Sequence, residues 1–473
     1  MSFESELKQA KDLCKTEPDE ALRICNTILN EDFDGKYGQM ALFMAAYIML
    51  QAERYGLAYQ MYQRCAQLNP NISEIYSNMG MCLEESDPGK ARKMFQKASH
   101  VKPDNANAYA NEALICLQTN KAEKCIQLCD KALSIDPTLK AAKHNKGLAQ
   151  LMLRKWSEGW RNYFDTVGVK HRERRDYGLP EWNGEPGTVI VYGEQGVGDE
   201  IMFSSCLPDI IRTNKVIFDC DSRLEELFKR SFDIPIYGTR FKKETPLLDN
   251  NKADYQCAIG QLPHFYRNSE KEFPGTPYLK PCPDQSIMWR ALFDTFKGKK
   301  IGVAWSGGLV STGKKKRSFN IEDFEPLFND NDTFISLEYN PVDEEAKNKY
   351  KLKTYSKVTK KGGDIDDLAA LISQLDYVVT ACTTVVYIAG ALGIPCYVLV
   401  PKEPGYRYHN KGSFPWYKSV KLIRQSGTWR QTMKKVKDAE NIYRLRPSRD
   451  SGLPRSMSID TESVIDSGLI HAN

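Results

Sequence analysis

The chain has 473 residues, more than a single hydrophobic core usually serves, so we expect two or three domains. Apolar residues make up 41% and charged residues 27%, as in ordinary globular proteins, which excludes a chain that is disordered throughout. The 66 basic and 61 acidic residues leave a formal net charge of only +5, so the composition gives no reason to expect a nucleic-acid partner.

The thirteen cysteines are scattered, and no Cys-x-x-Cys pair suggests a zinc or redox site. The first residues contain no basic segment that leads into an apolar stretch, and no run of about 18 apolar residues occurs. We therefore expect a cytoplasmic protein without a membrane span.

The first third of the chain repeats itself. Three similar segments end in Pro70, Pro103 and Pro137, an interval close to the roughly 34-residue period of tetratricopeptide repeats. A small residue precedes each proline at a fixed distance, and a second residue follows it four positions later: Ala58 and Tyr62, Ala91 and Phe95, Cys125 and Cys129. Small residues let paired helices approach closely, and proline ends the second helix.

The same register extends outward to Ala21 and Cys25, and to Gly147, Gly159 and Tyr163. We predict four to five helix pairs over residues 4 to 165, and assign residues 1–165 to a tetratricopeptide array. The resemblance to that family implies a concave surface that binds a protein or peptide, while the repeated small, aromatic and proline positions build the solenoid itself.

A different pattern begins after residues 166–187, a charged stretch with glycine and proline that we interpret as a linker. Short β-branched runs then alternate with amphipathic stretches, which predicts parallel βαβ units. A proline-rich break at 274–283 divides this part into two lobes, 188–297 and 298–446, and a nucleotide would bind between two such sheets. The expected strands are 188–192, 215–219, 255–259, 300–305, 333–337, 377–380 and 396–400.

The first strand leads into a glycine turn that contains Gly196 and Gly198, followed by Asp199 and an apolar helix. Such a turn brings backbone amides and a helix N-terminus close to an anion, although it can equally be structural. Asp199 is a candidate general base or a helix cap, and the residues alone do not decide between these roles.

The second lobe opens with a strand and a turn at Ser306 and Gly307, and a cluster of cations from Lys314 to Arg317 follows. Hydroxyls and cations after a glycine turn suit a pyrophosphate, whereas a solvated basic loop is the alternative interpretation. Farther along, Cys382 precedes Thr383 and Thr384 at the start of a helix, where threonines can cap the helix or bind a phosphate.

Together these features resemble tetratricopeptide proteins that carry a GT-B glycosyltransferase domain, related to heptosyltransferases and more distantly to protein O-linked N-acetylglucosamine transferases. The resemblance spans nearly residues 1 to 430. It rests on the shared order of these segments: 193–203, 219–224 with 230–232, 305–308 with 317–318, 336–339, 382–386 with 389–393, and 416–417 with 424–425. The fold it implies is an all-α solenoid followed by a two-lobed, double Rossmann-like α/β domain.

The resemblance implies a glycosyltransferase that moves a sugar from a nucleotide-diphosphate donor to a hydroxyl acceptor recruited by the repeats. Asp199 would be the general base. The donor would lie against Gly196, Gly198, Ser306 and Gly307, with Arg317 and Lys314 neutralising the leaving phosphate and residues 382–384 holding it at a helix start. The nucleotide sugar would be a co-substrate, with no cofactor and no catalytic metal; the acidic pair at 219 and 221 would lie away from the donor.

Two departures support an alternative. Relatives commonly have Asp at the position of Cys382 and His at that of Tyr387. In the alternative interpretation, the chain is a tetratricopeptide scaffold that binds a protein partner and carries a degenerate sugar-nucleotide domain. A sugar-nucleotide epimerase is a third possibility, although it would have little use for repeats. By the same resemblance, a helix over 431–445 returns to the first lobe, and we expect a disordered tail at 447–473.

Overall fold

The computed structural model describes residues 2–33, 35–169, 172–240, 252–308, 314–359 and 362–443. The expected tail at 447–473 lies outside these residues. The chain divides into two compact units, Met1–Leu153 and Arg154–Asn473. Among the residues described, every helix is too short or too polar to cross a lipid bilayer.

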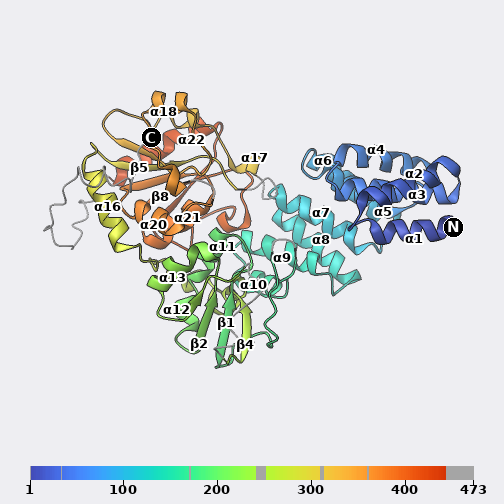
Figure 1. Ribbon diagram of the computed structural model, residues 1–473, viewed down its shortest axis with the longest axis horizontal. Coiled ribbons are helices and arrows are strands. Elements are labelled where there is room, and N and C mark those ends of the chain that lie inside the picture. Colours follow the sequence, from blue (N-terminus) through green and yellow to red (C-terminus); the bar gives the residue numbers. More distant parts are fainter. Residues whose placement is uncertain are drawn as a thin grey trace. The chain divides into compact units, whose positions relative to one another are not determined.

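The first unit is a tetratricopeptide-like solenoid, in which consecutive helices pack as hairpins (Figure 1). Asp87 and Asn105 cap the N-termini of α6 and α7 with their side chains, and proline opens α2 and α6. The helices are α1 Phe3–Leu13, α2 Pro18–Glu31, α3 Lys36–Gln51, α4 Tyr55–Leu68, α5 Ser73–Leu83, α6 Pro88–Val101, α7 Ala106–Gln118, α8 Ala122–Ile135 and α9 Lys140–Met152.

The repeated small and aromatic positions are buried in the solenoid. Ala58, Ala91 and Cys125 have no exposed surface, and Phe95 lies so close to α5 that a Cβ on Gly80 would be 2.5 Å from its ring. These positions therefore build the core of the array, as their spacing predicted.

The second unit begins with α10 Trp156–Phe164, so the expected array of residues 1–165 extends past the division between the units. Trp160 is almost fully buried and contacts Tyr163, Phe203 and Trp416 edge to face. Part of the expected linker also packs on the first sheet, where the backbone N–H of Trp182 donates to Gln256 O at 2.8 Å.

The first sheet of this unit is parallel, with strand order β3-β2-β1-β4. Its strands are continuous apolar runs because helices cover both faces of a parallel sheet. The elements are β1 Thr188–Tyr192, α11 Val197–Ser204, α12 Leu207–Ile210, β2 Lys215–Asp219, η1 Ser222–Leu224, α13 Glu225–Ser231, β3 Ile236–Tyr237, β4 Tyr255–Ala258, η2 Ile259–Gln261, α15 Pro263–Tyr266 and η3 Glu270–Glu272.

The second sheet is also parallel, with order β6-β5-β7-β8-β9 and a core that includes Val303, Phe324, Val379 and Leu399. The elements are α16 Pro283–Asp294, β5 Lys300–Ala304, α17 Lys314–Arg317, η5 Ile321–Phe324, β6 Thr333–Ser336, α18 Glu344–Tyr350, α19 Ser356–Thr359, α20 Ile365–Ser373, β7 Tyr377–Thr380, α21 Thr384–Leu392, β8 Cys396–Val400, η6 Tyr406–Tyr408, β9 Val420–Arg424 and α22 Trp429–Tyr443.

The segment 274–283 connects the two sheets and contacts elements of both. Tyr278 N–H donates to Ala391 O at 2.9 Å, and its hydroxyl donates to Ile201 O of α11. The last helix differs from expectation: Met433 and Val436 of α22 lie in the core of the second sheet, so over residues 429–443 this helix packs there instead of returning to the first sheet.

The strand orders identify where ligands bind to such sheets. In the first sheet β2 and β4 lie on opposite sides of β1, and in the second sheet β6 and β7 lie on opposite sides of β5. The strand order reverses at these points, and in open parallel sheets ligands bind outside the carboxyl ends of the strands there. The turns that follow β1, β5 and β7, together with the first turns of helices α11 and α21, contain all the site residues predicted from the sequence except those of α17.

Candidate functional site

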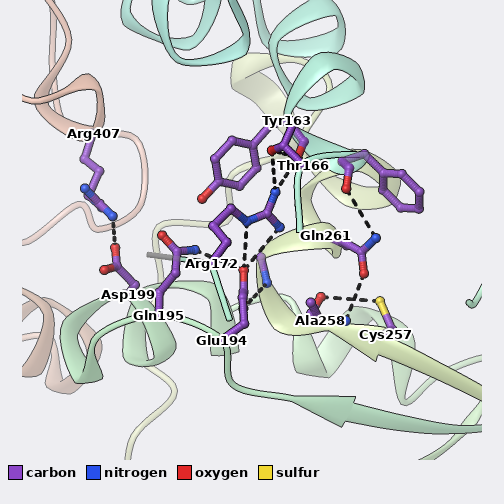
Figure 2. A network of polar contacts seen from close by, with 12 residues as sticks. Tyr163, Thr166, Arg172, Glu194, Gln195, Asp199, Cys257, Ala258, Gln261 and Arg407 are labelled. Atoms are coloured by element: carbon purple, nitrogen blue, oxygen red, sulfur yellow. Dashed lines mark hydrogen bonds and ion pairs between the residues drawn. The ribbon is translucent and has the colours of Figure 1, made fainter. Parts of the chain in front are cut away.

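The turn after β1 places Asp199 in the first turn of α11. Gly196 is the N-cap residue, and the N–H of Asp199 donates to its carbonyl at 2.9 Å. The carboxylate of Asp199 is therefore not the helix cap. It points away from the helix and forms an ion pair with Arg407 of η6, after β8 (Figure 2).

The pair Asp199–Arg407 is largely shielded from solvent, with 20% of the Asp199 side chain and 23% of the Arg407 side chain exposed. Burial by itself lowers the pKa of Arg407, but the Asp199 carboxylate and nearby tyrosines outweigh this and raise the pKa well above its usual value. The guanidinium is thus a fixed positive charge beside the candidate base.

A separate buried network contacts the turn after β1 through Glu194. Glu194 receives Arg172 Nη2 at 3.2 Å and Gln195 Nε2 at 3.0 Å, and Arg172 also donates to the backbone of Tyr163 and to Thr166 Oγ1 (Figure 2). Both Glu194 and Arg172 are fully buried. Because each is held by several partners, we interpret this network as structural.

Helices α11 and α21 meet at Gly198. A Cβ on this glycine would lie 2.9 Å from Cδ2 of Tyr387 and 3.3 Å from Oγ1 of Thr384. Thr383 is the N-cap of α21, where its hydroxyl accepts the N–H of Val385 at 3.3 Å. The contact thus brings Gly198 of the first turn beside Thr384 at an N-terminus that favours anions.

The backbone amides of the turn after β5 bind Glu338, which follows β6. The carboxylate of Glu338 accepts Trp305 N–H at 3.0 Å and Ser306 N–H at 2.7 Å, and it also pairs with the hydroxyl of Ser306. Gly307 N–H donates to Ser318 Oγ at 3.0 Å. These three amides are therefore engaged within the protein, so the turn offers a phosphate fewer donors than its sequence indicates.

The cationic segment folds back onto the turn after β7. Arg317 donates from Nη1 to Cys382 O at 3.0 Å, and a Cβ on Gly307 would lie 3.3 Å from Cβ of Arg317. Lys314 is half-buried, and its carbonyl accepts the hydroxyl of Ser318 at 2.7 Å. Arg317 thus lies against both Gly307 and the backbone of Cys382.

The two departures from the resembling family are both buried. The thiol of Cys382 donates to Leu399 O at 3.6 Å, and burial raises its pKa to about 12, so the thiol stays neutral at physiological pH. The hydroxyl of Tyr387 lies 3.3 Å from that of Tyr408. Cys382 therefore cannot replace an aspartate as a charged group, and its backbone carbonyl accepts the hydrogen bond from Arg317.

The acidic pair after β2 is engaged by protein groups. Asp219 accepts Tyr177 Oη at 2.5 Å and Thr239 Oγ1 at 2.8 Å, and it pairs with Arg175 at 2.7 Å. Asp221 pairs with Arg223 at 2.7 Å. Within the described ranges, no group of three or more His, Cys, Asp or Glu side chains could hold a metal ion.

Sequence reasoning missed two residues of the site, Arg407 and Glu338. Arg407 stands between Tyr406 and Tyr408 in a loop without a recognisable motif. Its one signal is position, because the loop follows the carboxyl end of a buried parallel strand. Glu338 belongs to a segment of the resemblance, but a carboxylate is not an obvious partner for a turn expected to bind phosphate.

Comparison with known proteins leaves the family open, since no family model matches the chain. Protein FlbA of Caulobacter vibrioides is 26% identical over 359 residues, which cover 70% of this chain and 60% of that protein. The chain therefore spans less than two thirds of the curated relative that it matches.

Solved structures of repeat proteins resemble part of the chain. A structure of MamA is 20% identical and covers 33% of this chain and 91% of its own, with a TM-score of 0.30. A thermophilic TPR protein of Thermus thermophilus is 16% identical and covers 35% of this chain and 91% of its own, with a TM-score of 0.31.

Proposed function

We propose that this chain is a metal-independent GT-B glycosyltransferase whose repeats recruit the acceptor. The observation that carries the proposal is the convergence of residues predicted separately from the sequence. Gly198 of α11, the neighbour of Asp199, lies beside Thr384 of α21, and Arg317 binds the backbone carbonyl of Cys382, two residues before Thr384. A base on one side and cations with a helix N-terminus on the other suit transfer from a diphosphate.

In the proposed reaction, an acceptor hydroxyl attacks the anomeric carbon of the sugar. A bond forms between the acceptor oxygen and this carbon, while the bond from the carbon to the diphosphate oxygen breaks. Asp199 takes the hydroxyl proton, and the nucleoside diphosphate leaves with the bonding electron pair. Arg317 and the N-terminus of α21 stabilise the negative charge that develops on the leaving oxygen.

The repeats would supply acceptor recognition. The solenoid of α1 to α9 is a separate compact unit, and its repeated consensus positions are buried in its own core. Its exposed helix faces are therefore available to bind a peptide or protein. A protein acceptor would be held there while its hydroxyl enters the site.

One alternative has specific support. Glu338 occupies the amides of the turn after β5, and Cys382 is a buried neutral thiol, so the α/β unit could be a degenerate domain on a protein-binding scaffold. The retained Asp199 and Arg317 favour the transferase.

Calorimetric titration with uridine, guanosine, adenosine and cytidine diphosphates, and then with their sugars, tests the proposal. We expect one nucleotide to bind, and its sugar to be hydrolysed slowly when no acceptor is present. If none of the diphosphates or sugars binds the wild-type chain or the variant Asp199→Asn, the transferase proposal fails and the scaffold alternative takes its place.

A further inference from the structure

Arg407 forms an ion pair between elements that belong to different sheets. It lies on η6, which follows β8 of the second sheet, but its ion pair is with Asp199 on α11 of the first sheet. The buried Nε of Arg407 makes no hydrogen bond. A guanidinium has five donors in a planar fork, and this one therefore has donor capacity that suits a bidentate anion such as a phosphate.

The ion pair lies in the same group of side chains as the N-terminus of α21. Asp199 adjoins Gly198, which contacts Thr384 and Tyr387, and Tyr387 in turn lies 3.3 Å from Tyr408, the neighbour of Arg407. The charges of both Asp199 and Arg407 act on Tyr387, whose pKa burial raises to about 12. A diphosphate at this N-terminus and the carboxylate of Asp199 would therefore compete for one guanidinium.

We infer that Arg407 exchanges partners: it pairs with Asp199 in one state and with the diphosphate of a bound nucleotide in the other, which frees Asp199 to act on an acceptor. This inference rests on the proposed function. Its consequence is an order of events, because the base becomes available only after the donor has bound. Asp199 also acts as an internal competitor, which lowers the apparent affinity for the diphosphate.

The test compares diphosphate affinities in the full-length chain by calorimetry, using the four nucleoside diphosphates on the wild type and on Asp199→Asn, Arg407→Gln and the double variant. Asparagine keeps the shape of the side chain but not its charge. We expect Asp199→Asn to tighten binding at least about fivefold and Arg407→Gln to weaken it by about tenfold or more. The double variant should bind like Arg407→Gln alone.

The matched control is Asp366→Asn. It removes the ion pair of Arg230 on α13 with Asp366 on α20, which also joins elements of the two sheets. It leaves Asp199 and Arg407 in place. We expect unchanged affinity. An equal gain in the control would mean that loosening the unit tightens binding, and it would overturn the exchange of partners. If Arg407→Gln does not fold, Arg407→Lys retains the charge without the fork and should still weaken binding.

Two negative results are distinguishable. If a diphosphate binds the wild type but Asp199→Asn binds it no more tightly, the ion pair is a structural clamp, and only this inference fails. If no diphosphate binds either the wild type or Asp199→Asn, the donor site of the proposed function is absent and both proposals fail. Binding that appears only in Asp199→Asn would support the exchange most directly.

Discussion

The charge of Asp199 can be removed without changing its shape, which makes Asp199→Asn the first test of its proposed role as base. We expect the rate of sugar transfer or donor hydrolysis to fall by roughly 10²- to 10⁴-fold, because an amide cannot accept the hydroxyl proton. Donor affinity should not fall, since the base acts in the transition state. Rates under donor saturation check this, and loss of donor binding together with activity would contradict it.

The cysteines provide a second test at the residue scale, one that reports on burial. Cys282 is partly exposed, and the other cysteines are buried. Burial raises the pKa of Cys206 to about 11 and that of Cys382 to about 12, so at pH 7.5 almost none of either thiol is in the reactive thiolate form.

We therefore expect iodoacetamide to modify Cys282 first in the native chain, and the buried thiols only after unfolding. Peptide mass spectrometry of a time course at pH 7.5, with a denatured sample as the control, measures the order. Early modification of Cys382 would mean that the turn after β7 opens to solvent.

At the scale of elements, the approach of α11 to α21 depends on one glycine. In Gly198→Ala the new methyl group would lie 2.9 Å from Cδ2 of the buried Tyr387 ring, so the helices must separate. We expect the free energy of unfolding to fall by about 1–3 kcal/mol, as in other overpacked sites, together with weaker diphosphate binding. Denaturant titration and calorimetry measure the two effects.

Gly196→Ala is the matched control two residues earlier. A Cβ at Gly196 meets only Oδ2 of Asp199, at 3.7 Å, and the backbone φ of −73° suits any residue. The loss of a glycine N-cap should cost less than about 1 kcal/mol. If both variants lose the same free energy of unfolding, the contact between α11 and α21 is not the cause of the loss in Gly198→Ala.

Elements with a strong local signal were predictable from the sequence. The strands β1, β2, β7 and β8 have the predicted bounds, because a buried parallel strand is a continuous apolar run between turn residues. The missed β3 has only two residues, and β9 follows β8 after a segment rich in aromatics with no α-helix between the two strands. The expected return of the last helix to the first lobe came from the resemblance, whereas Met433 and Val436 of α22 lie in the core of the second sheet.

The site was predictable only in part, for a related reason. Glycine turns and helix starts are local, so Gly198 and Thr384 could be singled out. The partners that decide their chemistry come from distant segments: Arg407 reaches Asp199, and Glu338 takes the amides of Trp305 and Ser306. No local pattern encodes such long-range pairs.

At the scale of the whole molecule, the division at Leu153 and Arg154 assigns α10 to the α/β unit even though its sequence continues the repeat pattern. Trp160 is buried against Phe203 and Trp416, one from each sheet's segments. The guanidinium of Arg172 lies 3.9 Å from the ring centroid of Tyr163 and donates to the backbone of the same residue. Helix α10 is thus a structural part of the unit that contains the site.

This assignment predicts different outcomes for two fragments of the chain. A fragment of residues 154–443 should unfold cooperatively in denaturant, whereas one of residues 166–443 should not fold. The shorter fragment lacks Trp160 and Tyr163, and removing one large aromatic side chain from a core costs roughly 3–5 kcal/mol, against a total stability of about 5–15 kcal/mol. It also leaves the buried charge of Arg172 without its contacts to Tyr163.

Fluorescence and circular dichroism through a urea titration measure both fragments, and the variant Trp160→Ala in the longer one separates the loss of this side chain from the loss of the helix. Equal cooperative unfolding of the two fragments would instead assign α10 to the repeats, and the helical array would then extend to Phe164.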